Sequence, residues 1–549
     1  MTHVGNNHNQ TTAKLSIVEF EGFGLRSASM RLFLLSVLAL TLGCVHASPN
    51  SNELSSACKQ ATRFASPQDF LKACAETRVI ELTRELVKFE TVSAAGPIHE
   101  NQGFLDMAAY LENWAGQHGS QYEMHGKHDV WVLSYGEGPL STGFLMHADV
   151  VPVNQTQWTV PAYDAQIKNG RLYGRGTEDD KGPIAAAMIV FETLNAFNIK
   201  PKGKLQIIMG TGEEHNWDGM RAYAKSQAVP KHIISVDASY PVVIAESGFV
   251  AWHLGIKKTS LASVSALARI HTLEAGNFLT QVPGKAHMIL SPGRSETEEA
   301  LQNRVTEAMM SQIAKHGSAF SGTVTSSQAG IMVTAKGKAV HSSTSEDGAN
   351  ALWLLAAVAA ELELVDNEAN KILRLVNTHL SSHYGESLNL AYEHDVMGKL
   401  TVIPSLLRDK KDSLSLSINM RRPEGKSVDE FRTSLDEALK KIQNDISPAI
   451  FQIKDAYIGT PALAKTDGPL VPTLIDIYQK HTNDKTAKPK SIRGGTYARL
   501  FEGAVSFGPS MPGKEYRGHA PDEYIEIETL HRMVHMLYEA TERLALSED

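Results

Sequence analysis

The order of apolar runs between residues 130 and 236 restricts the fold more than any other feature of the sequence. Four short runs have the length and composition of buried strands, at 130–134, 143–146, 205–209 and 233–236. Segments with a helical spacing of apolar residues alternate with them, at 183–197 and 217–226. Strands and helices that alternate at this spacing predict an α/β fold with a layered sheet. The helical pattern from Pro67 to about Ala115 predicts further helices that cover this sheet.

A middle region, residues 253–460, is predicted to be a separate α+β domain that interrupts the first one. Strand-like residues 330–334 precede a helical segment at 350–364, and strand-like residues 413–420 precede a helix that begins at Val428. A chain of 549 residues is long enough for two such domains. The predicted parts of the chain are a leader at 1–47, the first domain at 48–252, the inserted domain at 253–460, and the remainder of the first domain at 461–549.

The N-terminal residues have the pattern of a signal peptide. Met30 and Arg31 precede the apolar stretch 32–42, and residues 45–47 fit a small-residue cleavage site after Ala47. The apolar stretch is too short to cross a bilayer as a helix. We therefore expect export to the periplasm or the medium, without a stable membrane span and with translation starting at Met30. Attachment to lipid through Cys44 is the alternative.

Cleavage after Ala47 would leave two cysteines, Cys58 and Cys74, both in the first helical region. An even pair in an oxidising compartment is the usual composition of a disulfide. Two separate thiols are the alternative, and neither cysteine has the setting of a nucleophile or a metal ligand.

The overall charge argues against nucleic acid as a partner. The formal net charge is -8, and no Lys/Arg-rich stripe is interleaved with aromatic residues. The hydrophobic share of 42% is typical of a globular protein.

Polar residues interrupt or follow the predicted strands at five places. They are His147-Ala-Asp149, Asp179-Asp180, Glu213-Glu214, Asp237 and His519. Carboxylates and imidazoles beside apolar strands are costly unless a cation or a hydrogen-bond network compensates them. Each segment alone also fits an acidic helix N-terminus, a solvated turn or a structural histidine. Together they predict a centre that holds two metal ions.

The amino-acid sequences of these segments, and their order, resemble those of the M20 family of metallopeptidases. The resemblance runs from about residue 75 to the C-terminus through HADVVPV, GRGTEDDKGP, GTGEE, DASYPVVIAESG, GKAVHSS, GGTYAR and GHAPDEYI. Within the family it is strongest to the PepV-like dipeptidases, with a carnosinase-like or other dipeptidase branch left open. It implies a zinc-peptidase-like layered catalytic domain with an inserted α+β lid domain.

The resemblance also implies a role for each metal-site residue. Asp179 would bridge two divalent ions, with His147 and Asp237 completing one site and Glu214 and His519 the other. Asp149 would orient His147, and Glu213 would act as general base and acid. Zinc is the first choice of metal, with cobalt or manganese as alternatives. Asp rather than Glu at position 237 favours dipeptides over the substrates of carboxypeptidases and deacylases.

The residues implied to bind substrate lie in the lid and in a late loop. His341 would polarise the scissile carbonyl, and Arg421 or its neighbour Arg422 would grip the terminal carboxylate. The loop Gly494-Gly495-Thr496 would contact the carboxyl end of the substrate. One departure from the family pattern is Thr280 in place of an asparagine, with Asn277 nearby.

The resulting prediction is an exported di-metal dipeptidase, monomeric because its lid completes the cleft within one chain. The same centre would serve an N-acyl-amino-acid deacylase or carboxypeptidase, the nearest rival. An inactive homologue that only binds peptides is the alternative of a different class.

Overall fold

The computed structural model describes Cys58, residues 60–259 and residues 265–546. The predicted signal peptide, its cleavage site and Cys44 lie outside these residues. Cys58 and Cys74 are joined by a disulfide, with their Cα atoms 5.4 Å apart. Within the described residues, no helix combines the length and apolar character needed to cross a membrane.

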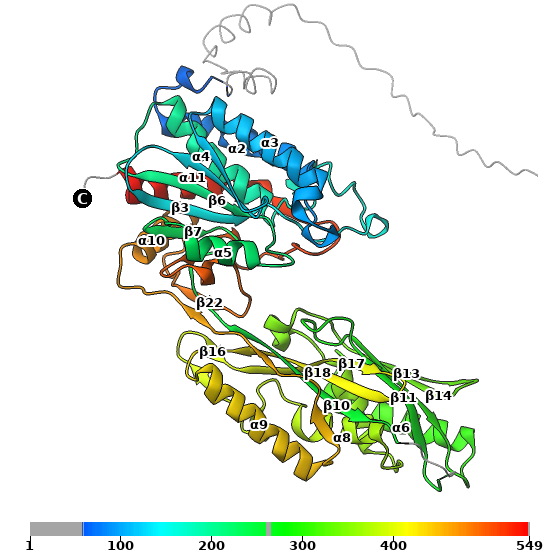
Figure 1. Cartoon of the computed structure of the whole chain (residues 1–549). Helices are drawn as coiled ribbons and strands as arrows, with labels where there is room; N and C mark the ends of the chain where they lie inside the picture. Colours follow the sequence, from blue (N-terminus) through cyan, green and yellow to red (C-terminus); the bar gives the residue numbers. More distant parts are fainter. Residues whose placement is uncertain (1–57, 59, 260–264, 547–549) are drawn as a thin grey trace, which may run out of the picture. The chain divides into compact units, whose positions relative to one another are not determined.

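The first sheet has nine strands and contains the strands predicted between residues 130 and 236 (Figure 1). In spatial order the strands are β1 (Gln121–His125), β2 (Val130–Tyr135), β6 (Lys204–Gly210), β3 (Leu140–His147), β7 (His232–Ser235), β23 (Val505–Ser506), β9 (Val243–Glu246) and β21 (Ala462–Leu463), with β22 (Lys490–Ile492) also beside β9. The four strands β6, β3, β7 and β23 follow one another in this order and are parallel to one another. Their carboxyl ends therefore meet at one edge of the sheet.

Helices cover both faces of this sheet, which confirms the predicted α/β class. Helices α2 (Pro67–Val87), α4 (Lys181–Ala196) and α11 (Ile527–Thr541) pack against one another on one side (Figure 1). On the other side, Val130 and Val132 pack with Met220 and Tyr223 of α5 (Asp218–Ser226). Alternate strand residues thus face opposite layers, as the two-residue period of a strand requires. The remaining helices of this part are α3 (Gln102–Gln117) and α10 (Leu470–Thr482).

The second sheet also has nine strands and is antiparallel throughout its paired strands. Its order is β13 (Ser321–Ser327), β14 (Gly330–Lys336), β12 (Lys285–Ser291), β11 (Arg269–Ala275), β17 (Thr401–Asp409), β18 (Ser413–Arg422), β10 (Gly248–Lys257) and β19 (Ile450–Gln452), with β20 (Tyr457–Ile458) also beside β10. The boundary predicted at residue 253 falls inside β10, because the chain passes from β9 to β10 through the single residue Ser247. The division into domains remains a prediction.

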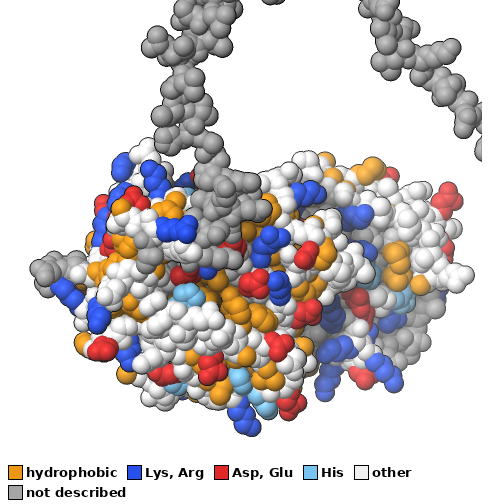
Figure 2. Space-filling model, turned by 90° about the horizontal axis from the view of Figure 1, so that it is seen from above, with side chains coloured by type: hydrophobic (Ala, Val, Ile, Leu, Met, Phe, Trp, Pro, Cys, Tyr) orange, Lys and Arg blue, Asp and Glu red, His pale blue; other side chains and the backbone are white. Residues whose placement is uncertain are grey.

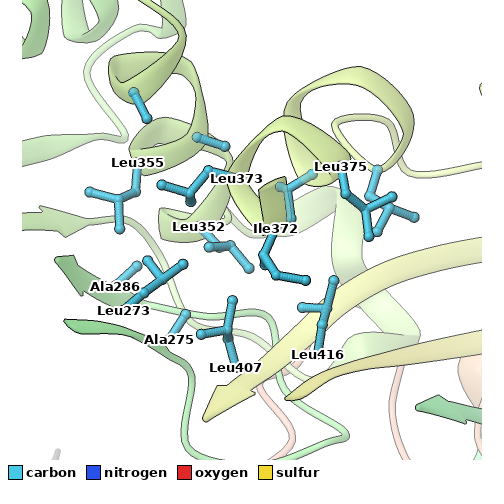
Figure 3. Close-up of a cluster of buried hydrophobic side chains, with 14 of the residues drawn as sticks. Leu273, Ala275, Ala286, Leu352, Leu355, Ile372, Leu373, Leu375, Leu407 and Leu416 are labelled. Atoms are coloured by element: carbon cyan, nitrogen blue, oxygen red, sulfur yellow. The ribbon is translucent and has the colours of Figure 1, made fainter. Parts of the chain in front are cut away.

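Helices α7 (Ala351–Ala360) and α8 (Glu368–His379) lie on one face of the second sheet (Figure 3). Leu352 and Leu373 point from them toward Leu407 and Leu416 of the strands (Figure 3), and all four side chains are buried. Burying a leucine contributes about 1.5–3 kcal/mol. Helices α6 (Glu298–His316) and α9 (Val428–Asp445) complete this part, and α9 begins with a capping box between Ser427 and Glu430.

Acidic and basic side chains are interspersed on the face shown in Figure 2, with hydrophobic side chains scattered among them. This face has no field of one sign that would favour a polyanion.

Candidate metal centre

Three of the predicted ligands, His147, Glu214 and Asp237, lie with the predicted base Glu213 at the same edge of the first sheet. His147 is the last residue of β3, Glu213 and Glu214 follow β6, and Asp237 follows β7. Because β3 is parallel to both β6 and β7, these side chains converge although they are far apart in the sequence.

The first group that could hold a metal ion consists of His147, Asp179 and Asp237, whose candidate ligand atoms lie within 4.8 Å of one another. Nε2 of His147 is 2.7 Å from Oδ1 of Asp179 and 3.7 Å from Oδ1 of Asp237. His147 is fully buried, so its ring has a fixed setting for a ligand.

The second group consists of Asp179, Glu214 and His519, again with candidate ligand atoms within 4.8 Å of one another. Nε2 of His519 is 2.8 Å from Oε1 of Glu214 and 3.2 Å from Oδ2 of Asp179. His519 has a positive φ of 62°, which is uncommon for a residue with a side chain and typical of functional sites. Asp179 belongs to both groups and offers a different oxygen to each.

Asp149 links His147 to the loop that carries the two glutamates. Nδ1 of His147 is 3.0 Å from the backbone oxygen of Asp149 and 3.5 Å from its carboxylate. That carboxylate accepts hydrogen bonds from the backbone N–H groups of Glu213 and Glu214, each at 3.0 Å. Ser93 donates to it as well, at 2.7 Å. The carboxylate therefore fixes the Glu213-Glu214 loop as well as lying beside the imidazole.

The pKa values of the residues in the two ligand groups are shifted because several carboxylates lie close together there. Burial and the charge of Asp237 raise the pKa of Glu213 well above its usual range. Burial and the charge of Asp179 raise the pKa of Glu214 to about 7. Loss of hydration alone would lower the pKa of His519, but its hydrogen bonds to Asp179 and Glu214 raise it to about 11.

Divalent cations would relieve this repulsion. Each group supplies one imidazole nitrogen and carboxylate oxygens, a donor set that suits zinc, cobalt or manganese. The residues present therefore fit a centre of one or two such ions.

The loop that carries Asp179 is held by a second buried carboxylate, that of Glu523. One oxygen of Glu523 accepts from the Arg175 guanidinium at 2.7 Å and from the N–H of Gly176 at 3.0 Å. The other accepts from the N–H groups of Glu178 at 2.9 Å and Asp179 at 3.1 Å. Glu523 itself is fully buried. It thereby ties the segment after His519 to the backbone of Asp179.

His341 has a neutral imidazole and lies in the part of the chain that contains the second sheet. Its Nδ1 accepts from the backbone N–H of Ser343 at 3.3 Å and lies 2.6 Å from the hydroxyl of that residue. Loss of hydration beside the protein and the charge of Arg421 lower the pKa of His341 to about 4. With Nδ1 as acceptor, the ring proton is on Nε2, which is left to donate.

Arg421 and Arg422 have different surroundings, as neighbours on a strand must. Arg421 donates to the backbone oxygen of Arg493 at 3.0 Å and to the Ser342 hydroxyl at 3.2 Å. The Nε atoms of both arginines are buried without a hydrogen-bond partner, and among the described residues neither guanidinium has an ion-pair partner. Arg422 donates to the backbone oxygens of Gly459 and Lys426, at a separate place.

The Gly494-Gly495-Thr496 loop is anchored through its threonine. The N–H and hydroxyl of Thr496 donate to the buried carboxylate of Glu246 at 3.0 and 2.7 Å. Gly495 lies against Arg499, and a Cβ there would come within 2.6 Å of that guanidinium. Thr280 offers its backbone oxygen to the N–H of Ser342, beside His341.

Sequence reasoning missed two residues of the centre, Glu523 and Tyr516. Tyr516 donates from its hydroxyl to Oδ2 of Asp179 at 2.5 Å. Both lie within four residues of His519, so their proximity to a predicted ligand was the available signal.

The chain is similar to known proteins over most of its length. A family described as Peptidase family M20/M25/M40 matches residues 143–543. The chain is 30% identical over 416 residues to the Bacillus subtilis protein named "Putative dipeptidase YtjP", covering 75% of this chain and 85% of that protein. It is 28% identical over 424 residues to a Staphylococcus aureus protein also named "Putative dipeptidase", covering 77% and 86%.

Among solved structures, the chain is similar to an M20 family metallo-carboxypeptidase from Sulfolobus solfataricus, with a TM-score of 0.49, 14% identity, and coverage of 84% of this chain and 98% of that chain. It is also similar to human carnosine dipeptidase 1, with a TM-score of 0.48, 13% identity, and coverage of 88% and 98%. The family match covers most of the chain and the motifs fall within it. The chain therefore belongs to peptidase family M20/M25/M40 and is a metallopeptidase.

Proposed function

We propose that this metallopeptidase is an exported dipeptidase that uses two divalent metal ions, zinc being the first choice. The two ligand groups that share Asp179 support a count of two. Ions held there supply Lewis-acid polarisation of the scissile carbonyl and a water of lowered pKa.

Glu213 is the proposed general base. Its backbone is fixed by Asp149, and its raised pKa suits a carboxylate that takes a proton from water and passes it on. The proton goes from the attacking water to the Glu213 carboxylate and then to the nitrogen of the leaving amine. Asp149 acts through the loop it holds and through the ring of His147.

His341 is the proposed donor to the substrate carbonyl. Its neutral ring carries the proton on Nε2, because Nδ1 accepts from the N–H of Ser343. A fixed N–H donor stabilises the negative charge that develops on the carbonyl oxygen.

The observation that carries the choice of a short substrate with a free carboxyl end is the guanidinium of Arg421, which lies beside Ser342. It is 6% exposed and has no acidic partner among the described residues. A buried cation of this kind is costly unless an anion joins it. A free carboxylate at the end of a short substrate would complete the pair, and guanidinium binds carboxylate with two hydrogen bonds. Among substrates with a free carboxyl end, the two relatives named "Putative dipeptidase" favour dipeptides.

A matched set of substrates tests the proposal. The set consists of a dipeptide, the same dipeptide with its C-terminus amidated, a tripeptide and an N-acetyl amino acid, each with and without a chelator. We expect the free dipeptide to have the highest kcat/KM and the chelator to abolish turnover. Preference for the N-acetyl amino acid would favour the deacylase or carboxypeptidase instead, and binding without turnover would favour the inactive peptide-binding homologue.

Arg421→Met makes the test specific. Loss of a buried charge pair with the substrate costs about 2–5 kcal/mol, so we expect the variant to lose at least 30-fold in kcat/KM on the free dipeptide. Its activity on the amidated dipeptide should change much less. An equal loss on both substrates would refute the assignment of Arg421.

Export is supported by the leader pattern and by the Cys58–Cys74 disulfide, since such bonds persist in oxidising compartments. N-terminal sequencing of the mature protein and cell fractionation test it, and a mature chain beginning at Ser48 is the expected result. A monomer is proposed because the long inserted region, 253–460, resembles a PepV-like lid that supplies both halves of the cleft within one chain. Light scattering in solution tests that state.

A further inference from the structure

Tyr516 lies on the loop between β24 (Pro509–Ser510) and β25 (Tyr524–Glu526), three residues before His519. Its ring centre is 6.3 Å from that of His519, and its hydroxyl donates to Oδ2 of Asp179 at 2.5 Å. Half of the residue is exposed, at 51%, while its hydroxyl reaches a carboxylate that is 7% exposed. The loop therefore places the phenol of Tyr516 so that it reaches from the surface to the buried carboxylate of Asp179.

The oxygen that Tyr516 contacts distinguishes the two ligand groups. Oδ1 of Asp179 faces His147, whereas Oδ2 faces His519. The phenol therefore meets the shared carboxylate on the side of the second group. A carboxylate oxygen has two lone pairs, so it can accept from the phenol and bind a cation at the same time.

Fixed contacts hold the loop on both sides of Tyr516. The carboxylate of Glu178, the residue before Asp179, accepts from the Ser510 hydroxyl at 2.9 Å and from the N–H of Arg517 at 3.0 Å. These anchors precede and follow Tyr516 in the sequence. These two hydrogen bonds therefore keep the phenol of Tyr516 close to Asp179 independently of its own hydrogen bond.

We propose that Tyr516 is a positioning residue that orients the Asp179 carboxylate toward the group formed with Glu214 and His519. This inference rests on the proposed two-metal function. A short O–H···O⁻ hydrogen bond is among the strong ones, and outer hydrogen bonds of this type fix ligand orientation at metal sites. Loss of such a partner typically costs about 10–100-fold in metal affinity. The loss should fall on one of the two sites.

Tyr516→Phe removes the hydroxyl and keeps the ring. Zinc titration of the chelator-treated, full mature chain by calorimetry should give two binding events in the parent protein. In the variant, one event should weaken about tenfold or more while the other keeps its affinity. The cobalt-loaded proteins should also differ in their visible absorption spectra. Tyr524→Phe is the matched control, because this nearby tyrosine packs on Arg171 and Tyr173 instead.

The outcomes separate this inference from the proposed function. Two events with parent affinities in Tyr516→Phe would overturn the inference and leave the two-metal proposal intact. Tighter binding in the variant would also overturn it, since the hydroxyl would then compete with an ion. Absence of metal binding by the parent chain would overturn the proposed function itself. The metal-free variant should keep the circular dichroism spectrum of the parent, and Tyr516→Leu repeats the test if the phenylalanine variant does not fold.

Discussion

Glu523→Gln is the change that best tests how the Asp179 loop is held. The carboxylate accepts from one guanidinium and three backbone N–H groups, and both it and Arg175 are buried. Glutamine keeps one acceptor oxygen and replaces the other by an NH2 donor, so two of the four donors lose their acceptor and the Arg175 charge loses its partner. Breaking a buried ion pair in this way costs about 3–5 kcal/mol.

The measurement is the free energy of unfolding of the metal-free protein in urea, followed by circular dichroism. We expect Glu523→Gln to lower it by about 3–5 kcal/mol. Glu515→Gln is the control from the same segment, because Glu515 pairs with Arg517 at 3.2 Å while 68% of its side chain is exposed. An exposed pair contributes at most about 1 kcal/mol. Equal unfolding curves for Glu523→Gln and the parent protein would refute the role given to this carboxylate.

Three further predictions concern acidity, the disulfide and metal removal. Burial and the nearby His531 and His481 lower the pKa of His535 to about 4. Between about pH 6.5 and 4 the unfolded chain therefore binds more protons than the folded protein, so the free energy of unfolding should fall as the pH drops through this range. Melting temperatures at pH 7.5 and 5.0 should differ less in His535→Gln than in the parent, and an unchanged difference would contradict the assignment. Replacing Cys58 and Cys74 by serine opens a link across a sequence separation of 16, which should lower the unfolding free energy by about 3 kcal/mol; unchanged urea unfolding would contradict this. Zinc at 100 times its Kd should raise the unfolding free energy of chelated protein by about 2.7 kcal/mol, and no rise in melting temperature would count against a metal centre.

The strands and the residues that follow them could be predicted because each is coded locally. The apolar runs that became β2, β3, β6 and β7 have the length and composition of buried strands, and the polar residues at their ends differ clearly from them. Parallel strands then bring His147 and Asp237 to one edge by topology alone. The family resemblance supplied the roles of Asp179 and His519, which lie on loops and do not follow an apolar run.

Contacts between distant loops could not be predicted in this way. Glu523 meets the N–H of Glu178 across more than 300 residues, and nothing in either segment specifies the partner. The choice between Arg421 and Arg422 was open for a different reason. Neighbours on a strand point to opposite faces, and only the structure shows that Arg421 contacts Ser342, beside His341, while Arg422 donates to Gly459 at a separate place.

Strand β23 lies between β7 and β9 in the first sheet, although the whole second sheet precedes it in the sequence. During synthesis, the place for β23 must stay open until residues 505 and 506 have emerged from the ribosome. Unpaired strand edges are templates for pairing with other chains. A chain that ends before Val505 would therefore present the facing edges of β7 and β9 to its neighbours, and we expect it to aggregate rather than fold its first sheet.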